Sequence, residues 1–116
     1  MADTDCLFCK IVAGEIPSTV VLENDACYAF RDINPQAPTH VVVVPRDHHP
    51  DLDALAAADP ALTARLIATC TEVAKGEGLP DGGYRIVFNT GAGAGQSVFH
   101  VHGHVLGGRP MTWPPG

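Results

Sequence analysis

The chain has 116 residues, of which 46% are hydrophobic, and it carries a formal net charge of -6. This length fits one domain, residues 1–116, and the apolar fraction excludes an intrinsically disordered chain. Seven Lys and Arg residues against thirteen Asp and Glu residues leave no basic stripe for DNA or RNA phosphates. No secretory signal opens the chain, and the longest apolar run, residues 41–44, is too short for a bilayer. We therefore expect a cytoplasmic protein with no nucleic-acid polymer and no membrane as a partner.

The first third of the chain predicts a short helix followed by a hairpin. Residues 4–14 read as a helix whose N-cap is Thr4 or Asp5. Residues 19–25 and residues 26–32 are two runs of β-branched and aromatic residues that meet at an Asn-Asp turn. This pattern indicates two antiparallel strands directly after the helix.

The middle of the chain predicts a central strand and two capped helices. Residues 40–46 are apolar on both faces of a strand, which is typical of a strand inside a sheet. Asp51 and Asp59 are suitable N-caps, and Asp59 is followed by Pro60 at the first helical position. Apolar residues then recur at helical spacing as far as Gly76, so this helix packs one stripe on the sheet.

The last third predicts two strands joined by a glycine-rich loop, over residues 83–90, 91–97 and 98–108. The order of elements lacks strict alternation of strands and helices, so we expect an α+β fold with a mainly antiparallel sheet. The loop lacks the lysine of a P-loop and enters a strand. It is either a flexible connection or a set of backbone amides that bind an anion.

Three histidines, His100, His102 and His104, stand at every second position of the run HVHGHVL. In a strand they lie on one face. Packing alone does not explain them, because a buried imidazole needs hydrogen-bond partners. They can bind a catalytic metal, or one can act as a nucleophile that forms a covalent phosphoryl intermediate. No carboxylate follows Asp81, which favours the nucleophile, although Asp32 or Asp47 can fold back onto this strand.

The run HVHGHVL matches the His-x-His-x-His-x-x pattern of the histidine triad (HIT) superfamily, and GQSVFHVHGHVLGGR…WPPG resembles its Hint branch of nucleoside phosphoramidate hydrolases. FCKIVAGEIPS, AFRDINPQAPTH and VVVVPRDH are similar to that branch in the same order, so the resemblance covers nearly the whole chain. It implies an HIT-like five-stranded antiparallel sheet with two main helices. It also implies a homodimer whose sheets join into a ten-stranded sheet.

The resemblance implies a reaction in which His102 attacks the α-phosphorus of a purine nucleoside 5′-phosphoramidate. Water then releases the nucleoside monophosphate from a nucleotidyl-histidine, and the catalysis requires no cofactor. His40, His100, His104 and Ser97 match positions that support this step. How they divide the work between fixing the nucleophile and contacting phosphate or leaving group stays open.

The resemblance also implies a purine nucleotide site. Asp32 matches the carboxylate that accepts hydrogen bonds from the ribose hydroxyls, although it can equally be a turn residue at a strand end. Trp113 matches a residue that reaches the partner subunit's site, although it can also anchor the tail. The other matching positions surround the phosphate or the base, and the apolar ones also suit a core: Asn89, Gly95, Gln96, Ser97, Phe8, Ile11 and Ile16.

Cys6 and Cys9 stand on one face of the first predicted helix at a spacing that suits tetrahedral zinc. Similarity to some bacterial members implies that His48 and His100 complete a structural site, but His49 beside His48 leaves that choice open. The alternative is two unligated thiols packed on the sheet.

The same residues also suit other functions. The alternatives are a dinucleoside polyphosphate hydrolase or nucleotidyl transferase of another HIT branch, and a non-enzymatic nucleotide- or zinc-binding regulator. Gly103 stands where the pattern has a hydrophobic residue. Because glycine in a strand loses packing, we expect weaker support for the strand and no change of chemistry.

Overall fold

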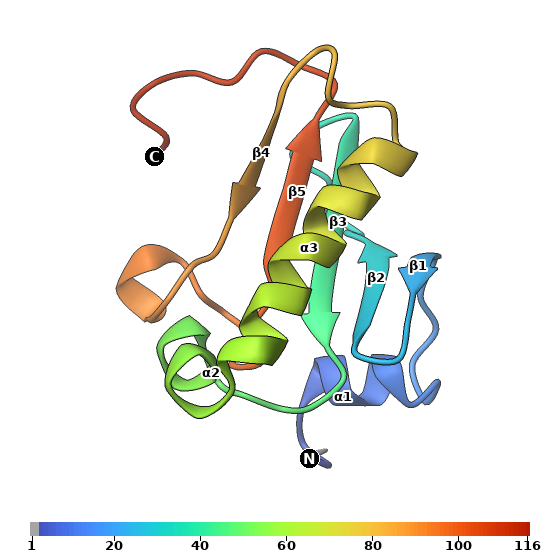
Figure 1. The fold of residues 1–116 in the computed structure, drawn as a ribbon, viewed down its shortest axis with the longest axis vertical. Helices are drawn as coiled ribbons and strands as arrows, with labels where there is room; N and C mark the ends of the chain where they lie inside the picture. Colours follow the sequence, from blue (N-terminus) through green and yellow to red (C-terminus); the bar gives the residue numbers. More distant parts are fainter. Residues whose placement is uncertain (1–2) are drawn as a thin grey trace.

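The computed structural model describes residues 3–116, and within them the chain forms a five-stranded antiparallel sheet with helices on both faces (Figure 1). The strand order is β1-β2-β3-β5-β4. The strands are β1 (Val20–Glu23), β2 (Cys27–Arg31), β3 (Thr39–Pro45), β4 (Tyr84–Val87) and β5 (Gly103–Gly107). The expected α+β fold and antiparallel sheet are confirmed.

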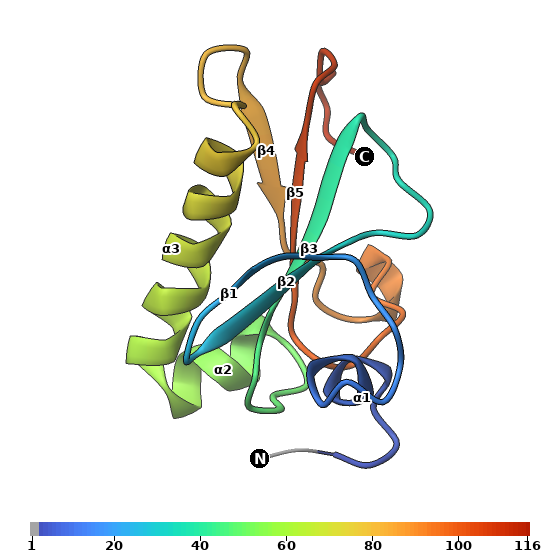
Figure 2. The ribbon, with the colours of Figure 1, turned by 90° about the vertical axis from the view of Figure 1, so that its right-hand side faces the viewer.

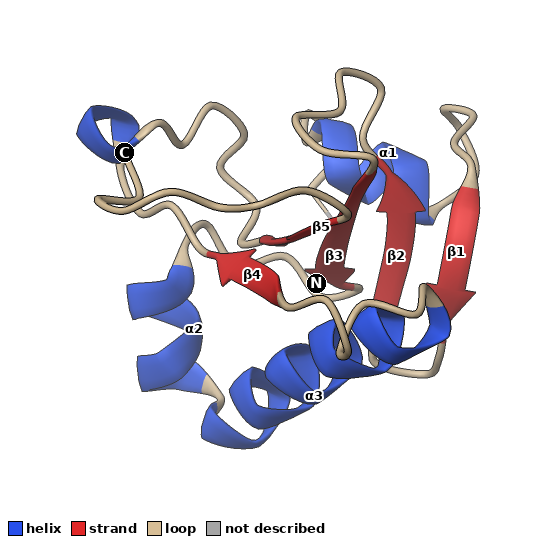
Figure 3. Ribbon diagram, turned by 90° about the horizontal axis from the view of Figure 1, so that it is seen from above, coloured by secondary structure: helices blue, strands red, loops and turns tan. Residues whose placement is uncertain are grey.

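Three layers result from the way the helices cover the sheet (Figures 2 and 3). The helices α2 (Leu52–Ala58) and α3 (Pro60–Gly76) lie on one face, and the short helix α1 (Leu7–Val12) lies on the other. Each face has its own apolar cluster. No helix within residues 3–116 combines the length and apolarity that a bilayer crossing needs.

The central strand β3 serves both clusters, as its sequence predicts. Val41 and Val43 pack on the α3 side, whereas Val42 and Val44 pack on the α1 side. All four side chains are almost completely buried. Since alternate residues of a strand point to opposite faces, the continuous valine run is explained by a strand covered on both sides.

The predicted caps are confirmed for two helices and wrong for the first. The Asp51 carboxylate accepts from the Ala54 N–H at 2.9 Å, and the Asp59 carboxylate accepts from the Leu62 N–H at 3.0 Å. The N-cap of α1 is Cys6, whose sulfur accepts from the Cys9 N–H at 3.4 Å. The thiol therefore takes the place expected for Thr4 or Asp5.

The final strand is shorter than predicted, and this changes where two of the histidines lie. β5 begins at Gly103, which pairs with Val43, so His100 and His102 precede the strand. The chain leaves the ladder here because the Val101 N–H donates to the His49 carbonyl at 2.7 Å. An extended segment outside the sheet thus carries two of the three histidines.

The glycine at position 103 allows close packing, so the expected weaker support of the strand is not found. A Cβ at this position would lie 2.9 Å from both Cys70 Sγ and Phe88 Cζ. Both contacts are on the α3 side, so Gly103 faces away from the histidines as predicted. Cys70 is fully buried, which agrees with its interpretation as a small hydrophobic residue.

Candidate active site and metal centre

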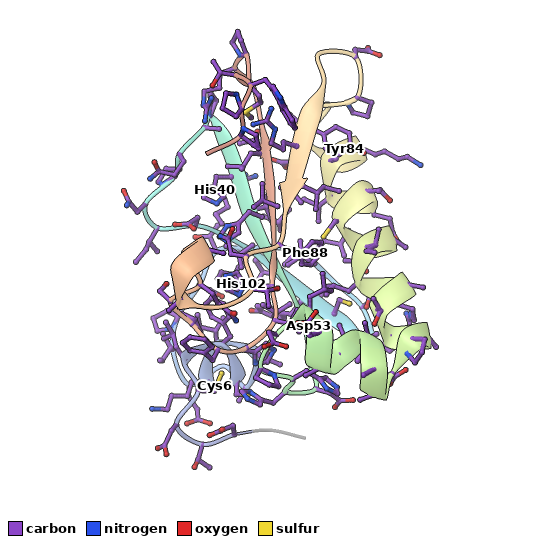
Figure 4. The ribbon with its side chains drawn as sticks, turned by 90° about the vertical axis from the view of Figure 1, so that its left-hand side faces the viewer. Cys6, His40, Asp53, Tyr84, Phe88 and His102 are labelled. Atoms are coloured by element: carbon purple, nitrogen blue, oxygen red, sulfur yellow. The ribbon has the colours of Figure 1, made fainter. Side chains whose placement is uncertain are left out.

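The imidazoles form a row on the sheet face opposite α3, where Figure 4 shows His40, His102 and Cys6 following one another. The ring centroids of His102 and His104 are 4.9 Å apart, and those of His104 and His40 are 5.1 Å apart. β3 supplies His40, β5 supplies His104, and the segment before β5 supplies His102. The prediction that the triad imidazoles share one side of the sheet is confirmed.

His102 is held in one tautomer by a backbone carbonyl. Its Nδ1 lies 2.7 Å from the carbonyl oxygen of His100, which can only accept, so Nδ1 carries the proton. The lone pair is then on Nε2. Burial lowers the pKa of His102, which keeps the ring neutral. A buried neutral imidazole with a free Nε2 lone pair is suited to nucleophilic attack.

His40 and His104 are held by a chain of hydrogen bonds that starts at the backbone. The Gln36 N–H donates to His40 Nδ1 at 3.0 Å, so the proton of neutral His40 is on Nε2. This Nε2–H donates to His104 Nδ1 at 2.9 Å, which leaves His104 with its proton on Nε2. Burial, with smaller contributions from His102 and His40, lowers the pKa of His104 to about 4. His104 therefore offers an N–H donor.

Asp32 folds back towards the histidines and also makes a turn. Its Oδ1 accepts from the Asn34 N–H at 2.8 Å, and its Oδ2 lies 3.4 Å from His40 Nε2. Asp32, His40 and His104 are close enough to surround a cation. In the hydrogen-bonded arrangement, however, His40 has no free lone pair, because Nδ1 accepts from Gln36 and Nε2 carries the proton.

A cavity of about 190 Å³ opens beside the imidazole row between α1 and β2. Its walls are mainly apolar, and Asp32 lies at its edge. Phe8 and Ile11 also belong to the α1-side core, so these residues are both core residues and part of the cavity wall. The residues predicted for the nucleoside that line this cavity are Phe8, Ile11, Ile16 and Asp32.

The glycine-rich loop folds on itself through Gln96, whose side chain is buried. The Gln96 carboxamide oxygen accepts from the Gly91 N–H at 2.9 Å, and its NH₂ donates to the carbonyls of Pro50 and Val98. The backbone amides of Gly91, Ala94, Gly95 and Gln96 all donate within the loop. The predicted anion-binding set of amides is therefore not available at these positions.

Three other predicted residues have simpler surroundings. Ser97 lines a second cavity, of about 470 Å³, together with Cys6 and His48. Asn89 is half-buried just after β4. Trp113 is 83% exposed, and the tail is held instead by Arg85, which donates to the Thr112 carbonyl at 3.0 Å. An anchoring role for this aromatic ring is thus not supported.

At the other end of the row, four potential metal ligands lie close together as predicted. His48, and not His49, is the second histidine of this cluster. His100 Nδ1 lies 3.3 Å from Cys6 Sγ, 3.5 Å from Cys9 Sγ and 3.2 Å from His48 Nδ1. Cys9 Sγ lies 3.5 Å from His48 Nδ1. The edges of a tetrahedral zinc site with sulfur and nitrogen ligands are about 3.3–3.8 Å, given the usual bond lengths. The spacing of these four atoms therefore fits zinc.

The protonation states of His100 and Cys9 also favour binding of a cation by the cluster. His100 Nε2 donates to the Pro45 carbonyl at 2.8 Å, which leaves the lone pair on Nδ1, inside the cluster. Burial lowers the pKa of His100 to about 4, so this ring is neutral. Burial also raises the pKa of the Cys9 thiol, and a cation would offset that cost.

Comparison with known proteins identifies the family. A model of the HIT domain matches residues 13–111. This chain belongs to the HIT family. It is 50% identical to a 14 kDa zinc-binding protein of Zea mays, over 98% of this chain and 90% of the relative. It is 47% identical to the adenylylsulfatase HINT1 of Arabidopsis thaliana, over 99% of this chain and 79% of the relative.

A solved structure supports the same assignment. The HIT family hydrolase from Legionella pneumophila superposes with a TM-score of 0.93 at 51% identity, and the match covers 97% of this chain and all of that one. The imidazole row is therefore found in an HIT fold.

Sequence reasoning missed the backbone groups that orient the imidazoles of this HIT protein. The Gln36 N–H and the carbonyls of Pro45 and His100 set which nitrogen of each ring is protonated. Every residue type other than proline carries the same backbone donor and acceptor, so no side-chain pattern could have revealed them.

Proposed function

We propose that this HIT protein is a nucleoside phosphoramidase that hydrolyses purine nucleoside 5′-phosphoramidates to the nucleoside monophosphate and an amine. The observation that carries the proposal is the orientation of His102. Its Nδ1 is tied to the His100 carbonyl, so Nε2 is free to attack phosphorus. A hydrolase related at 51% identity supports hydrolytic chemistry.

In the proposed reaction, His102 Nε2 forms a bond to the α-phosphorus while the bond from phosphorus to the amine nitrogen breaks. The departing nitrogen takes up one proton from solvent, while His104 Nε2–H, the donor in the row, hydrogen-bonds to a phosphoryl oxygen. Attack by His102 places compensating positive charge on its own ring. Water then attacks phosphorus, the bond from phosphorus to His102 Nε2 breaks, and the nucleoside monophosphate and one proton leave to solvent, which restores the neutral His102 ring.

The nucleoside is proposed to occupy the apolar cavity between α1 and β2. Phe8 offers a flat aromatic surface and Ile11 an aliphatic contact to a purine. Asp32, which also lines the cavity, can accept from the ribose hydroxyls. Because the glycine loop uses most of its amides internally, we assign the phosphate contacts to His104, Ser97 and Asn89. Gly95 and Gln96 then shape the loop.

Hydrolysis of a fluorogenic adenosine 5′-phosphoramidate tests this function. His102→Ala is expected to lower kcat by at least about 10³-fold, because the covalent route is lost. His49→Ala is the matched control, since His49 contributes its backbone carbonyl to Val101. A slow substrate should leave the nucleotidyl group on His102, as mapped by mass spectrometry. An adduct on another residue contradicts the proposal.

A second candidate activity is hydrolysis of adenylyl sulfate, the activity that the name of the Arabidopsis relative states. The same nucleophile would attack the same phosphorus with sulfate as the leaving group. Comparing kcat/KM for adenosine 5′-phosphoramidate and adenosine 5′-phosphosulfate decides which leaving group is preferred. His102-dependent turnover of neither substrate would favour the alternatives, a polyphosphate hydrolase or a non-enzymatic regulator.

We also propose that the four-ligand cluster holds structural zinc through Cys6, Cys9, His48 and His100. The ligand spacing and the name of the maize relative support it. Elemental analysis of the purified protein should find one zinc per chain, and Cys6→Ser should lose it. Wild-type protein that is folded and free of metal would contradict this site. Cys27 and Cys70 are buried and form no disulfide, which is typical of a protein from a reducing compartment, and we propose the cytoplasm.

A further inference from the structure

We propose that Cys6, Cys9 and His48 act as positioning residues for the nucleophile: with zinc bound, they hold His100 and Phe8, which in turn hold the His102 imidazole. The inference rests on the proposed function for its catalytic consequence.

His100 belongs to both sites at once. Its imidazole Nδ1 faces the cluster, whereas its backbone carbonyl accepts from His102 Nδ1 at 2.7 Å. The ring is completely buried and its Nε2 donates to the Pro45 carbonyl at 2.8 Å. Whatever fixes His100 therefore also fixes the acceptor that determines the tautomer of His102.

The sheet does not fix this carbonyl. The ladder between β3 and β5 begins at the pair Val43 and Gly103, so His100 lies outside it. The segment is held instead by residues 48 and 49. His48 contributes a cluster nitrogen 3.2 Å from His100 Nδ1, and the His49 carbonyl accepts from the Val101 N–H at 2.7 Å. The cluster thus replaces strand pairing at the point where the nucleophile is oriented.

Phe8 gives a second connection. It lies on α1 between the two cysteines, and its ring stands edge-on to the His102 ring with 4.9 Å between centroids. The same ring is 5.5 Å from Phe30 and 6.0 Å from His100. The thiols therefore tie the helix that supports one flank of His102, while His100 supports its Nδ1.

Loss of the metal should affect orientation more than nucleotide binding. α1 stays on the sheet through Phe8 and Ile11, which pack with the α1-side core, so the apolar cavity persists. The His102 ring, however, gains freedom to rotate and to exchange its proton between Nδ1 and Nε2. Loss of such supporting contacts costs about 10–100-fold in activity.

The test compares zinc-loaded and chelator-treated protein labelled with ¹⁵N in its histidines. Long-range ¹H–¹⁵N spectra report the tautomer of each ring. We expect His102 to be a single Nδ1–H tautomer with zinc and a mixture without it. In parallel, kcat should fall by about 10–100-fold, whereas the Kd for AMP should change by less than about 3-fold.

Variants separate metal binding from packing. His48→Ala should reproduce the zinc-free state, and His48→Cys, which restores four zinc ligands, should restore the single tautomer. His49→Ala, with its carbonyl retained, should behave as wild type. An unchanged His102 tautomer after zinc removal, or a protein that binds no zinc, overturns the inference even if the phosphoramidase is active. If turnover does not depend on His102, the proposed function fails while the tautomer measurement still decides this inference.

Discussion

Each histidine of the triad, His100, His102 and His104, has one nitrogen committed to a neighbouring group, and this determines what the other nitrogen can do. His102 donates from Nδ1 to a carbonyl, so its Nε2 is a nucleophile. His100 donates from Nε2, so its Nδ1 is a ligand. His104 accepts at Nδ1 and is a donor at Nε2. Identical side chains thus have three different chemical roles because their hydrogen-bond partners differ.

Asp32→Asn provides a residue-scale test of the ribose contact. Asparagine can retain the turn contact to the Asn34 N–H but loses the charge that strengthens hydrogen bonds from ribose hydroxyls. We expect kcat/KM for the adenosine phosphoramidate to fall by roughly 5- to 30-fold, about 1–2 kcal/mol. The loss should shrink with a 2′-deoxyadenosine substrate. Equal losses for both substrates would disprove the ribose contact.

His104 contributes to the pH dependence of stability, beside His100, whose pKa is also lowered to about 4. The folded pKa of His104 is about 4, mainly through burial, with His102 and His40 adding and Asp32 opposing. The unfolded value is about 6.5, so between these values the unfolded chain binds more protons. His104 should therefore lower the free energy of unfolding by on the order of 2–3 kcal/mol as the pH drops from about 6.5 to about 4.

Urea unfolding at several pH values measures this dependence. His104→Gln removes the titrating group, so its stability should decline less steeply over the same range. If the free energy of unfolding fell equally steeply with pH in wild type and variant, His104 would not have the lowered pKa.

At the scale of elements, the contact between β5 and α3 depends on a missing side chain. Gly103→Ala places a Cβ 2.9 Å from Cys70 Sγ and Phe88 Cζ, in a buried strand that cannot move freely. We expect a loss of about 1–3 kcal/mol in the free energy of unfolding. Gly76→Ala is the control, because nothing lies within 4 Å of its Cβ position, and it should be neutral or slightly stabilising. Equal stability of the two variants would contradict the packing argument.

At the scale of the whole molecule, the sheet has two edges, and we propose that β4 pairs with β4 of a second copy. β1 carries a register shift between Val20 and Leu22, which disturbs its edge, whereas β4 pairs in regular register with β5. The mass in solution should be twice the 12.2 kDa of the chain by light scattering. A monomer at micromolar concentration would exclude the proposed homodimer and its ten-stranded sheet.

Trp113 offers a second readout of the proposed dimer. Its ring is 83% exposed, so it is free to approach a partner subunit. Trp113→Ala should leave the dimer mass in solution unchanged. It should alter the ratio of kcat/KM values for two different purine substrates. If the activity per chain stays constant when the protein is diluted until the dimer dissociates, the tryptophan of the partner subunit contributes nothing to the site.

Much of the fold follows from local patterns. The two-sided valine run of β3, the Asp51 and Asp59 caps and the helical stripe ending at Gly76 are local properties of the chain. The start of β5 was predicted too early, because the Val101 N–H finds the His49 carbonyl, and no local pattern reports such a distant acceptor.

The sequence alone determined the chemical inventory: three alternating histidines and a pair of thiols one helical turn apart. Only the tertiary structure decided that His48 rather than His49 joins the thiols, that Gln96 closes the glycine loop, and which nitrogen of each imidazole is free. The reason is that these choices depend on contacts between residues far apart in the chain. Cys6 and His100, for example, are 94 positions apart and meet only when α1 packs on the sheet.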